Sequence, residues 1–306
     1  MGRYVLRRLV LAIPVLLGVS VGVFLMVAFV PGDPATVLAG DTASPEAIAR
    51  IRTELGLDQP LPIQYLHYLD RLLHGSLGTS IRTHRDVTVE ILDRLPYTLE
   101  LAVAAVLLST TLGIVLGVVA AVNRGRTADL LAMGVAIVGL SVPTFWIALL
   151  GILLFSLRLH WLPVTGAGSV ASLILPAVSL SLHSAAVKAR ITRSSMLEVL
   201  GQEYLRTARA KGLRERAVIW RHALRNALIP ITTIVGLQFG SLLGGAFIIE
   251  TIFAWPGVGR LAVQAIFNRD FPLIQGTVLL VAVAYLLTNL IVDVLYASLD
   301  PRIRYA

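Results

Sequence analysis

Six long apolar runs alternate with polar stretches along this chain. A helix that crosses a bilayer needs about 20 mostly apolar residues, and the runs approach or exceed that length. They are continuous, whereas the strands of a membrane barrel alternate apolar with polar positions. The pattern therefore predicts an all-α polytopic membrane protein with six transmembrane helices, at residues 9–30, 99–122, 130–157, 170–187, 228–249 and 273–297.

The first apolar run could instead belong to a cleaved signal peptide, because Arg3, Arg7 and Arg8 precede it. It is longer than the roughly 7–15 apolar residues of such peptides, and no cleavage site made of small residues follows it. We therefore expect residues 1–30 to remain as an N-terminal transmembrane helix.

The lysine and arginine residues predict how the helices are oriented, because segments rich in these residues stay on the cytoplasmic side of a membrane. If the N-terminus lies there, so does the segment 188–225, which carries ten basic residues. The segment 31–97 then lies outside, and it carries nine acidic and six basic residues. We therefore expect a multi-pass protein with both termini in the cytoplasm.

Two polar segments are too long to be simple connections. Residues 31–93 contain two helical patterns, one that begins at Ser44 and Pro45 and one at 64–73, and they predict a small helical cap on the outer face. The second segment, 188–227, is basic and amphipathic. The expected organisation is listed here by residue range: N-terminal helix 1–30, cap 31–93, five-helix transmembrane domain 94–297 that contains the loop 188–227, and cytoplasmic tail 298–306.

Composition agrees with this class. The chain is 56% hydrophobic and only 14% charged, with a mean hydropathy of +0.80, whereas soluble domains have about 25% charged residues. The net charge of +8 resides between apolar runs, so it indicates topology and not nucleic-acid binding. The absence of cysteine excludes disulfides and thiolate metal sites.

The stretch 203–230, EYLRTARAKGLRERAVIWRHALRNALIP, is the most informative part of the chain. It predicts two helices separated at Gly212, because glycine favours the left-handed turn that ends a helix. Before this glycine, long basic side chains alternate with small ones. The small side chains allow another surface to approach closely, and the basic side chains can bind it. The candidate contact residues are Arg206, Thr207, Ala208, Arg209, Ala210, Lys211, Gly212 and Leu213. From charge alone, a loop that contacts anionic lipid headgroups would explain the pattern as well.

This stretch resembles the cytoplasmic loop of the permeases of binding-protein-dependent ABC importers. Their pattern is E-A-A, three residues, a glycine, and later a proline that enters the next span. Here R-T-A occupies the first three positions, and the distance from Gly212 to Pro230 is longer than the common one. Both departures are features of the peptide/nickel branch, in which R-T-A-R-A-K-G and R-H-A-L-R-N-A-x-x-P recur. Four further pieces match that branch in order, at 30–34, 55–60, 250–270 and 292–301.

The resemblance implies the type I ABC importer fold and a location in a bacterial cytoplasmic membrane. It also implies an assembly with a second related permease, two cytoplasmic ATPases and an extracytoplasmic substrate-binding protein, surrounded by membrane lipid. Residues 208–213 would form a short coupling helix that sits in a cleft of an ATPase. ATP and Mg would be bound by those ATPases, so no cofactor is expected on this chain.

Four polar or aromatic residues near the spans are candidates for the translocation path or a gate. His183 and Gln238 lie within spans, where polar side chains either line a water-filled path or pack between helices. Glu250 and Trp255 belong to the turn-rich stretch 250–259, which could form an outer gate, receive the binding protein or provide an aromatic anchor at the membrane interface.

No motif for covalent chemistry is present in the sequence. Gly236, Gly240 and Gly244 have the spacing that favours close helix packing, and no G-x-x-x-x-G-K-[ST] loop that would hold a nucleotide occurs. Neither a metal-binding H-E-x-x-H motif, nor a carboxylate dyad, nor a serine nucleophile elbow appears. We therefore expect a transport subunit with no catalytic or metal-binding residues rather than a membrane enzyme.

The substrate is predicted less directly, because selectivity in this family rests largely on the binding protein. Uptake of di- or oligopeptides is our first interpretation, with nickel, as a chelate, or glutathione as the alternatives. A proton-coupled secondary transporter would show paired acidic residues within the membrane and internal inverted repeats. The sequence shows neither.

Overall fold

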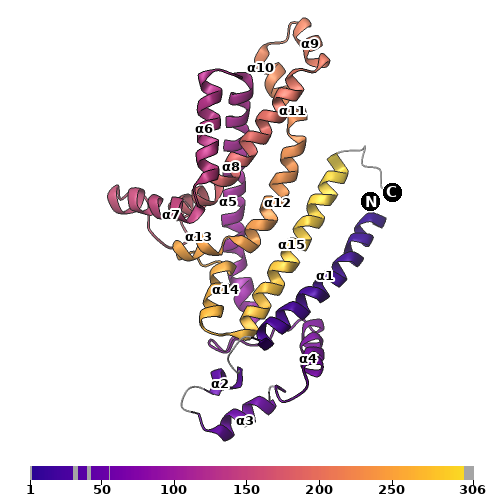
Figure 1. Ribbon diagram of the computed structural model, residues 1–306, viewed down its shortest axis with the longest axis vertical. Helices are drawn as coiled ribbons and strands as arrows, with labels where there is room; N and C mark the ends of the chain where they lie inside the picture. The colour runs from indigo at the N-terminus through magenta and orange to yellow at the C-terminus, as the bar shows by residue number, and fades with distance from the viewer. Residues whose placement is uncertain (1, 30–33, 40–42, 55, 300–306) are drawn as a thin grey trace.

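The computed structural model describes residues 2–29, 34–39, 43–54 and 56–299 of the 306-residue chain; within these ranges, the side chains of 2–5, 34, 38, 244–245 and 292–299 are not described. The sequence motifs at 30–34 and 292–301 therefore fall wholly or largely outside the described side chains. All named elements of the described ranges are helices, and they form an elongated bundle (Figure 1).

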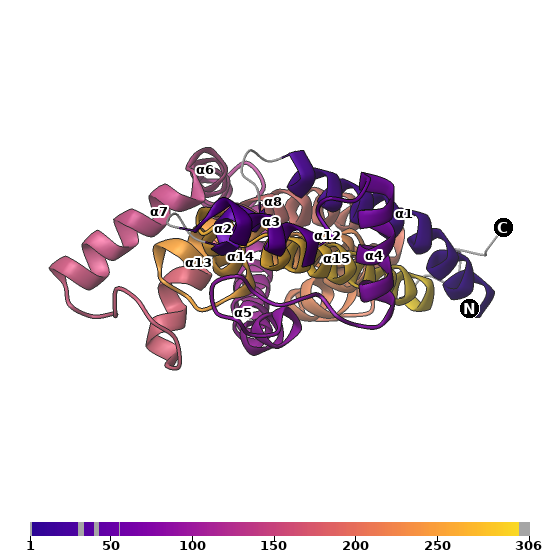
Figure 2. The ribbon, with the colours of Figure 1, turned by 90° about the horizontal axis from the view of Figure 1, so that it is seen from below.

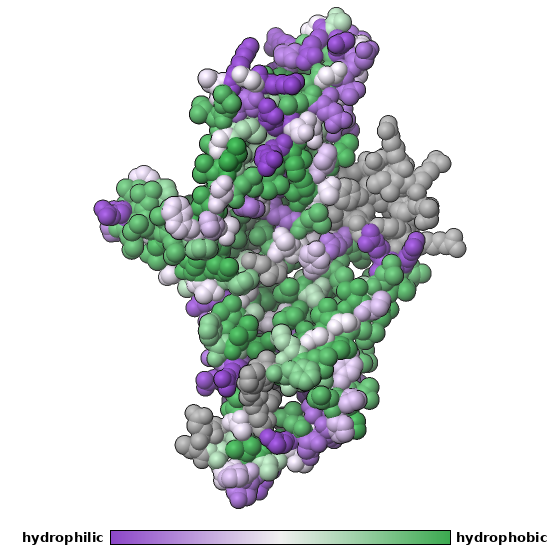
Figure 3. Space-filling view, viewed as in Figure 1, coloured by the Kyte–Doolittle hydropathy of each residue, from purple (hydrophilic) through white to green (hydrophobic). Residues whose placement is uncertain are grey.

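Four helices are long and apolar enough to cross a membrane, and two bent pairs of helices raise the number of possible spans to six. The four are α1 (Gly2–Phe29), α5 (Val87–Val122), α8 (Val170–Leu200) and α15 (Phe271–Leu299). The first bent pair joins α6 (Thr127–Ser141) to α7 (Thr144–Gly151) and the π-helical η1 (Ile152–Arg158), and the second joins α10 (Glu215–Ala217), η2 (Val218–Ala223, also π-helical) and α11 (Leu224–Ala227) to α12 (Ile229–Gly245). Figure 3 shows the expected surface, with hydrophobic residues over the middle of the bundle and hydrophilic ones gathered towards its two ends.

The third expected span is bent, although the sequence predicted one helix over 130–157. The chain turns by 101° between α6 and α7. Val142 has an extended backbone (φ −92°, ψ 126°) because the residue before a proline, here Pro143, is disfavoured in a helix. As a result, α7 projects sideways from the bundle in both views (Figures 1 and 2).

Two helices are longer than the sequence predicted. Helix α5 begins at Val87, directly after Asp86, whose carboxylate accepts hydrogen bonds from the backbone N–H groups of Thr88 and Val89. The expected boundary between cap and transmembrane domain, at 93/94, therefore falls inside this helix. Helix α8 continues to Leu200, so residues 188–200 of the expected loop 188–227 are part of the bundle.

The α8 extension is amphipathic. Three of its side chains, spaced four residues apart, are fully buried: Lys188, Thr192 and Met196. This spacing places them on one face of a helix. Because polar residues surround these three positions in the sequence, the segment is not a continuous apolar run and was not predicted as part of a span.

Helices α5 and α8 pack backbone against backbone. A Cβ atom added to Gly113 would lie 2.6 Å from the Cβ of Lys188, and one added to Gly117 would lie 2.6 Å from the carbonyl oxygen of Ala189. Only glycine allows this approach. The sequence predicted close packing at Gly240 and its neighbours instead. Gly240 does contact α15, but the α5–α8 contact is tighter.

Short helices gather at both ends of the bundle. One end, called here the α3 end, carries α2 (Pro34–Ala39), α3 (Pro45–Glu54) and α4 (Leu61–Leu73), and the other, the α9 end, carries α9 (Glu203–Ala210). Two further short helices, α13 (Phe247–Ile252) and α14 (Val258–Phe267), lie between the middle of the bundle and the α3 end (Figure 1). The two helices predicted within 31–93 are confirmed as α3 and α4. Ser44 caps α3 by accepting a hydrogen bond from Ala47 N, and Tyr65 of α4 is hydrogen-bonded to Ser20 of α1.

Replacing Gly117 with alanine should weaken the bundle. The new methyl group would lie 2.4 Å from the Cβ of Thr192 and 2.6 Å from the carbonyl oxygen of Ala189, so α5 and α8 would have to separate. We expect a loss of about 1–3 kcal/mol in the free energy of unfolding, as for other overpacked sites. Thermal unfolding of the purified protein in detergent measures it.

Gly134→Ala in α6 is the matched control, because a Cβ at that position meets nothing within 4 Å. Its melting temperature should equal that of the wild type. Equal melting temperatures for both variants would show that the α5–α8 contact is not as tight as described.

Candidate functional site

The predicted contact residues lie at the α9 end of the bundle, at the top of Figure 1. Helix α9 is anchored by Leu205, which is fully buried, and by Ala208. These two side chains belong to an apolar cluster that also contains Val118 of α5, Met196 of α8 and Leu224 of α11. A force applied to α9 would therefore reach three helices of the bundle through this cluster.

The other predicted contact residues form an exposed surface, called here the α9 surface. Its members are Arg206, Thr207, Arg209, Ala210, Lys211, Gly212 and Leu213. Leu213 is 42% exposed although it is apolar. The surface thus combines small, basic and apolar groups, a composition suited to contact with another protein.

The turn after α9 is held in a left-handed conformation. Gly212 has φ +78°, and its N–H donates to Arg209 O at 2.9 Å, so the predicted helix end at this glycine is confirmed. Nothing lies within 4 Å of a Cβ added there. Glycine is therefore required by the backbone conformation and not by crowding.

An ion pair braces this turn. The guanidinium group of Arg209 donates to both carboxylate oxygens of Glu215, at 2.9 and 3.1 Å, and so connects α9 to α10 across Gly212. These hydrogen bonds raise the pKa of Arg209 above its usual value. The pair Arg206–Glu203 is looser, at 3.8 Å and well exposed.

A second ion pair near this end was not predicted from the sequence. Arg193 of α8 donates to both carboxylate oxygens of Asp129 of α6, each at 2.7 Å, and the backbone N–H of Gly125 donates to the same carboxylate. Asp129 is only 4% exposed. The sequence does show Asp129 at the start of an apolar run. An acidic residue that is buried there needs a partner.

Of the two candidates within spans, the structure buries one and exposes the other. Gln238 of α12 is 9% exposed, and its Oε1 accepts a hydrogen bond from Ser109 of α5 at 3.2 Å. Ser109 in turn accepts one from Nζ of Lys188, a fully buried residue of α8. His183 lies on the exposed side of α8, outside this network. Lys188 was missed because the sequence analysis assigned it to a solvated loop.

Glu250 lies on α13 and Trp255 follows this helix, and both are fully buried within this chain. The carboxylate of Glu250 accepts hydrogen bonds from Thr98 Oγ1 and from the backbone N–H of Arg260, each at 2.8 Å. Burial raises the pKa of Glu250, and these hydrogen bonds oppose the effect. Trp255 Nε1 donates to Tyr97 O at 2.9 Å. The side chain of Trp255 is thus part of the core of this chain.

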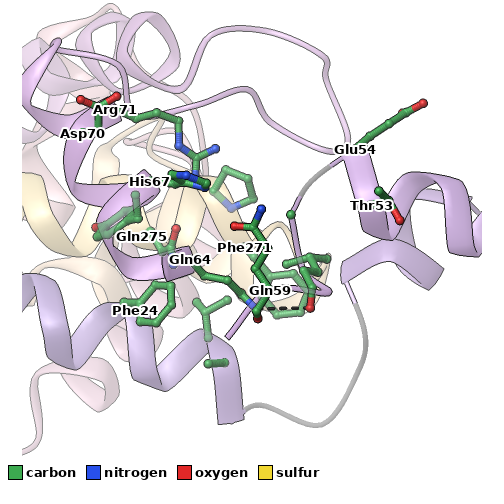
Figure 4. A pocket seen from close by; sticks show the side chains of 16 residues that line it. Phe24, Thr53, Glu54, Gln59, Gln64, His67, Asp70, Arg71, Phe271 and Gln275 are labelled. Atoms are coloured by element: carbon green, nitrogen blue, oxygen red, sulfur yellow. Dashed lines mark hydrogen bonds between the residues drawn. The ribbon is translucent and has the colours of Figure 1, made fainter. Parts of the chain in front are cut away.

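A cavity of about 530 Å³ lies between α1, the α3–α4 segment and the start of α15. Figure 4 shows Gln64, His67 and Arg71 of α4 around it, with Gln275 of α15 nearby. Gln64 Nε2 donates to Gln59 O at 2.8 Å and so fixes one wall. The sequence analysis named none of these residues. In the part of the chain that the structure describes, no group of three or more His, Asp or Glu residues could hold a metal ion.

Comparison with known proteins agrees with this geometry. Residues 113–305 match the family described as the binding-protein-dependent transport system inner membrane component, and residues 1–102 match the N-terminal family of the same transport systems. The glutathione transport system permease protein GsiC of Salmonella typhimurium LT2 is 48% identical over 302 residues, 99% of both chains. The protein of the same name from Escherichia coli K12 is 47% identical over the same length.

Two solved structures share the fold. The crystal structure of an amino acid ABC transporter with histidines has a TM-score of 0.51 at 20% identity, and it covers 71% of this chain and 95% of its own. The inward-facing MetNI methionine ABC transporter has a TM-score of 0.56 at 15% identity, with 70% and 97% covered. The matched family covers well over half of the chain and the relatives nearly all of it, and this chain therefore belongs to the family of inner-membrane permeases of binding-protein-dependent ABC importers, in its peptide/nickel branch.

Proposed function

We propose that this permease carries short peptides into the cell, with glutathione, a tripeptide, as the first candidate. The observation that supports glutathione is the 47–48% identity, over 99% of both chains, to permeases named for glutathione transport. Di- and oligopeptides belong to the same chemical class and remain the broader proposal. A nickel chelate is the weaker alternative.

We further propose that the α9 end faces the cytoplasm and the α3 end the outside. Seven lysine and arginine residues between 206 and 225, beyond the end of α8, support this orientation, because such residues are retained on the cytoplasmic side. Both termini are then cytoplasmic. The segment 31–93, with its cavity, faces the outside, where a substrate-binding protein would deliver its cargo.

The complete transporter in this proposal contains a second permease and two ATPases, which bind ATP and Mg. The chain itself is the transport subunit and hydrolyses nothing. ATP binding closes the ATPases and favours one of two conformations of the permeases. It does so because the ATPases bind ATP more tightly when the permeases are in that conformation. The α9 surface is where this motion enters the chain.

The packing around α9 supports this route. Leu205 and Ala208 share an apolar cluster with residues of α5, α8 and α11, and the chain continues from the braced turn through η2 into α12. The π-helical η2 is a type of irregular turn that is frequent at functional sites. Displacement of α9 would therefore move the inner ends of the spanning helices together.

Proteoliposomes that contain the complete transporter should accumulate radiolabelled glutathione in the presence of ATP and the binding protein. Uptake should stop when ATP is replaced by a non-hydrolysable analogue. An excess of unlabelled dipeptide tests the breadth of the substrate class, and free Ni²⁺ tests the metal alternative. ATP-dependent uptake of Ni²⁺ without uptake of any peptide would overturn the proposal.

Gly212→Pro should uncouple ATP hydrolysis from transport. Proline fixes φ near −65°, whereas Gly212 has +78°, and proline also lacks the N–H that donates to Arg209 O. We expect uptake to fall by roughly 5- to 150-fold, the range of typical coupling between sites. Uptake and ATP hydrolysis are measured in the same proteoliposomes.

Gly212→Asn is the matched control, because asparagine tolerates the left-handed conformation and keeps the N–H group. It should retain most of the uptake. If proline at this position transports as well as asparagine does, the α9 turn is not part of the coupling route.

A further inference from the structure

Lys188 is a charged residue placed deep inside the spanning helices. It lies 12 residues before the end of α8 at Leu200, and Ser109, its partner, lies 13 residues before the end of α5 at Val122. With a rise of 1.5 Å per residue, both are about 18–20 Å from the α9 end of these helices. The Lys188 side chain is fully buried, and its partners stand on the neighbouring helix α5.

The ammonium group of Lys188 has no anionic partner among the residues that the structure describes. Its Nζ donates to Ser109 Oγ and Thr110 Oγ1, each at 2.8 Å, and both acceptors are uncharged hydroxyl groups. A buried charge without a counter-charge is strongly unfavourable. Polar hydroxyl groups solvate it only in part, so one of the three N–H donors and the whole positive charge remain uncompensated.

The hydrogen bonds lead from Lys188 to α12. Because an ammonium group only donates, Ser109 accepts from Lys188, and its own hydroxyl proton is left to donate to Gln238 Oε1 at 3.2 Å. The amide of Gln238 is then polarised by the charge behind it, since hydrogen bonds in series strengthen one another. Its Nε2 is buried and has no hydrogen-bond partner.

Gln238 lines a groove of about 420 Å³ between three spanning helices. The groove is formed by Ser184 and Val187 of α8, Leu237, Gln238 and Ser241 of α12, and Tyr285 of α15. Its volume lies within the range of small-molecule sites, about 300–1,000 Å³, and its lining is apolar with a few polar groups, as is usual for them. Gln238, whose Nε2 has no hydrogen-bond partner, is thus part of the wall of this groove.

We propose that Gln238, with Lys188 as the charge behind it, forms a transient binding site for a carboxylate group of the transported peptide. Gln238 contacts the substrate, and Lys188 acts as a positioning residue that supplies positive potential through Ser109. The inference rests on the proposed function, because it needs a substrate with carboxylates. A carboxylate in the groove would satisfy Nε2 of Gln238 and neutralise the buried cation at the same time.

A purely structural lysine would be arranged differently. It would pair with a buried carboxylate, as Arg193 of the same helix α8 does with Asp129 of α6. Arg193, five residues after Lys188 in α8, pairs with a carboxylate. Lys188 instead donates to Ser109, which donates to Gln238, a residue that lines the groove.

Equilibrium binding of ³⁵S-labelled glutathione to the membrane complex in nanodiscs tests the proposal without the binding protein. The wild-type complex should bind glutathione saturably. The diester of glutathione, which lacks free carboxylates, should not compete. Lys188→Met and Gln238→Leu should each weaken binding by roughly 10- to 100-fold, as expected for loss of a charge-assisted hydrogen bond. Lys188→Arg should retain most of the affinity, because it keeps the charge.

Arg190→Met is the control, because Arg190 is exposed two residues further along α8 and should leave binding unchanged. Lys188→Met removes a buried charge without leaving a void, so it should fold, and the melting temperature of each variant verifies this. Equal affinities for the wild type and Lys188→Met, or equal competition by acid and ester, would overturn the inference. If wild-type uptake of glutathione fails in proteoliposomes, the proposed function fails instead, and the inference with it.

Discussion

The close contact between α5 and α8 is the constraint on which the rest of the structure depends. Gly113 and Gly117 let the two backbones meet, and no side chain larger than hydrogen fits at either position without movement. In a bilayer, helices cannot associate through the hydrophobic effect, because lipid is as apolar as their side chains. Close packing and interhelical hydrogen bonds take its place. The contact brings Ser109 and Thr110 of α5 to the ammonium group of Lys188.

Helices α5 and α8 support short helices at two levels of the bundle. Near the α9 end, α5 and α8 supply Val118 and Met196 to the cluster that anchors α9. Further along α5, Thr98 donates to Glu250 and accepts from Val258 N, which attaches α13 and α14 to the bundle. A displacement of α5 would therefore alter the surroundings of α9, α13 and α14 together.

The sequence predicted the parts of this fold that depend on local chemistry. Apolar length identified the spanning segments, Ser44 with Pro45 predicted the start of α3, and Gly212 predicted the end of α9. Each of these signals acts within a few residues of itself, so no knowledge of the tertiary structure was needed. The G-x-x-x-G spacing at 113–117 was equally visible, but the choice between it and the glycines of α12 depends on which partner helix is present.

The features that were not predicted all depend on contacts between distant segments. Lys188 looked like the first residue of a basic loop, since charge alone does not reveal that Ser109 and Thr110 approach it from α5. Trp255 was a candidate for an outer gate or for an interfacial anchor, because the sequence does not show its hydrogen bond to Tyr97, which is 158 residues away. The break at Pro143 was not predicted, because the apolar run continues on both sides of it. Charged and aromatic residues in a membrane protein are thus the positions where composition is least informative and packing decides the role.

One helix joins the three polar features of the transmembrane part. Helix α8 carries Ser184 and Val187 at the groove, Lys188 behind it, and Arg193 in the ion pair with Asp129, and it ends three residues before α9 begins. A rigid helix transmits displacement along its length, so a shift of α9 under the action of an ATPase would move Lys188 relative to Gln238, which stands on α12. The strength of the proposed carboxylate site would then vary with the state of the ATPases. A site that binds in one state and releases in the other is what directional transport needs, because a ligand shifts an equilibrium only by its difference in affinity for the two states.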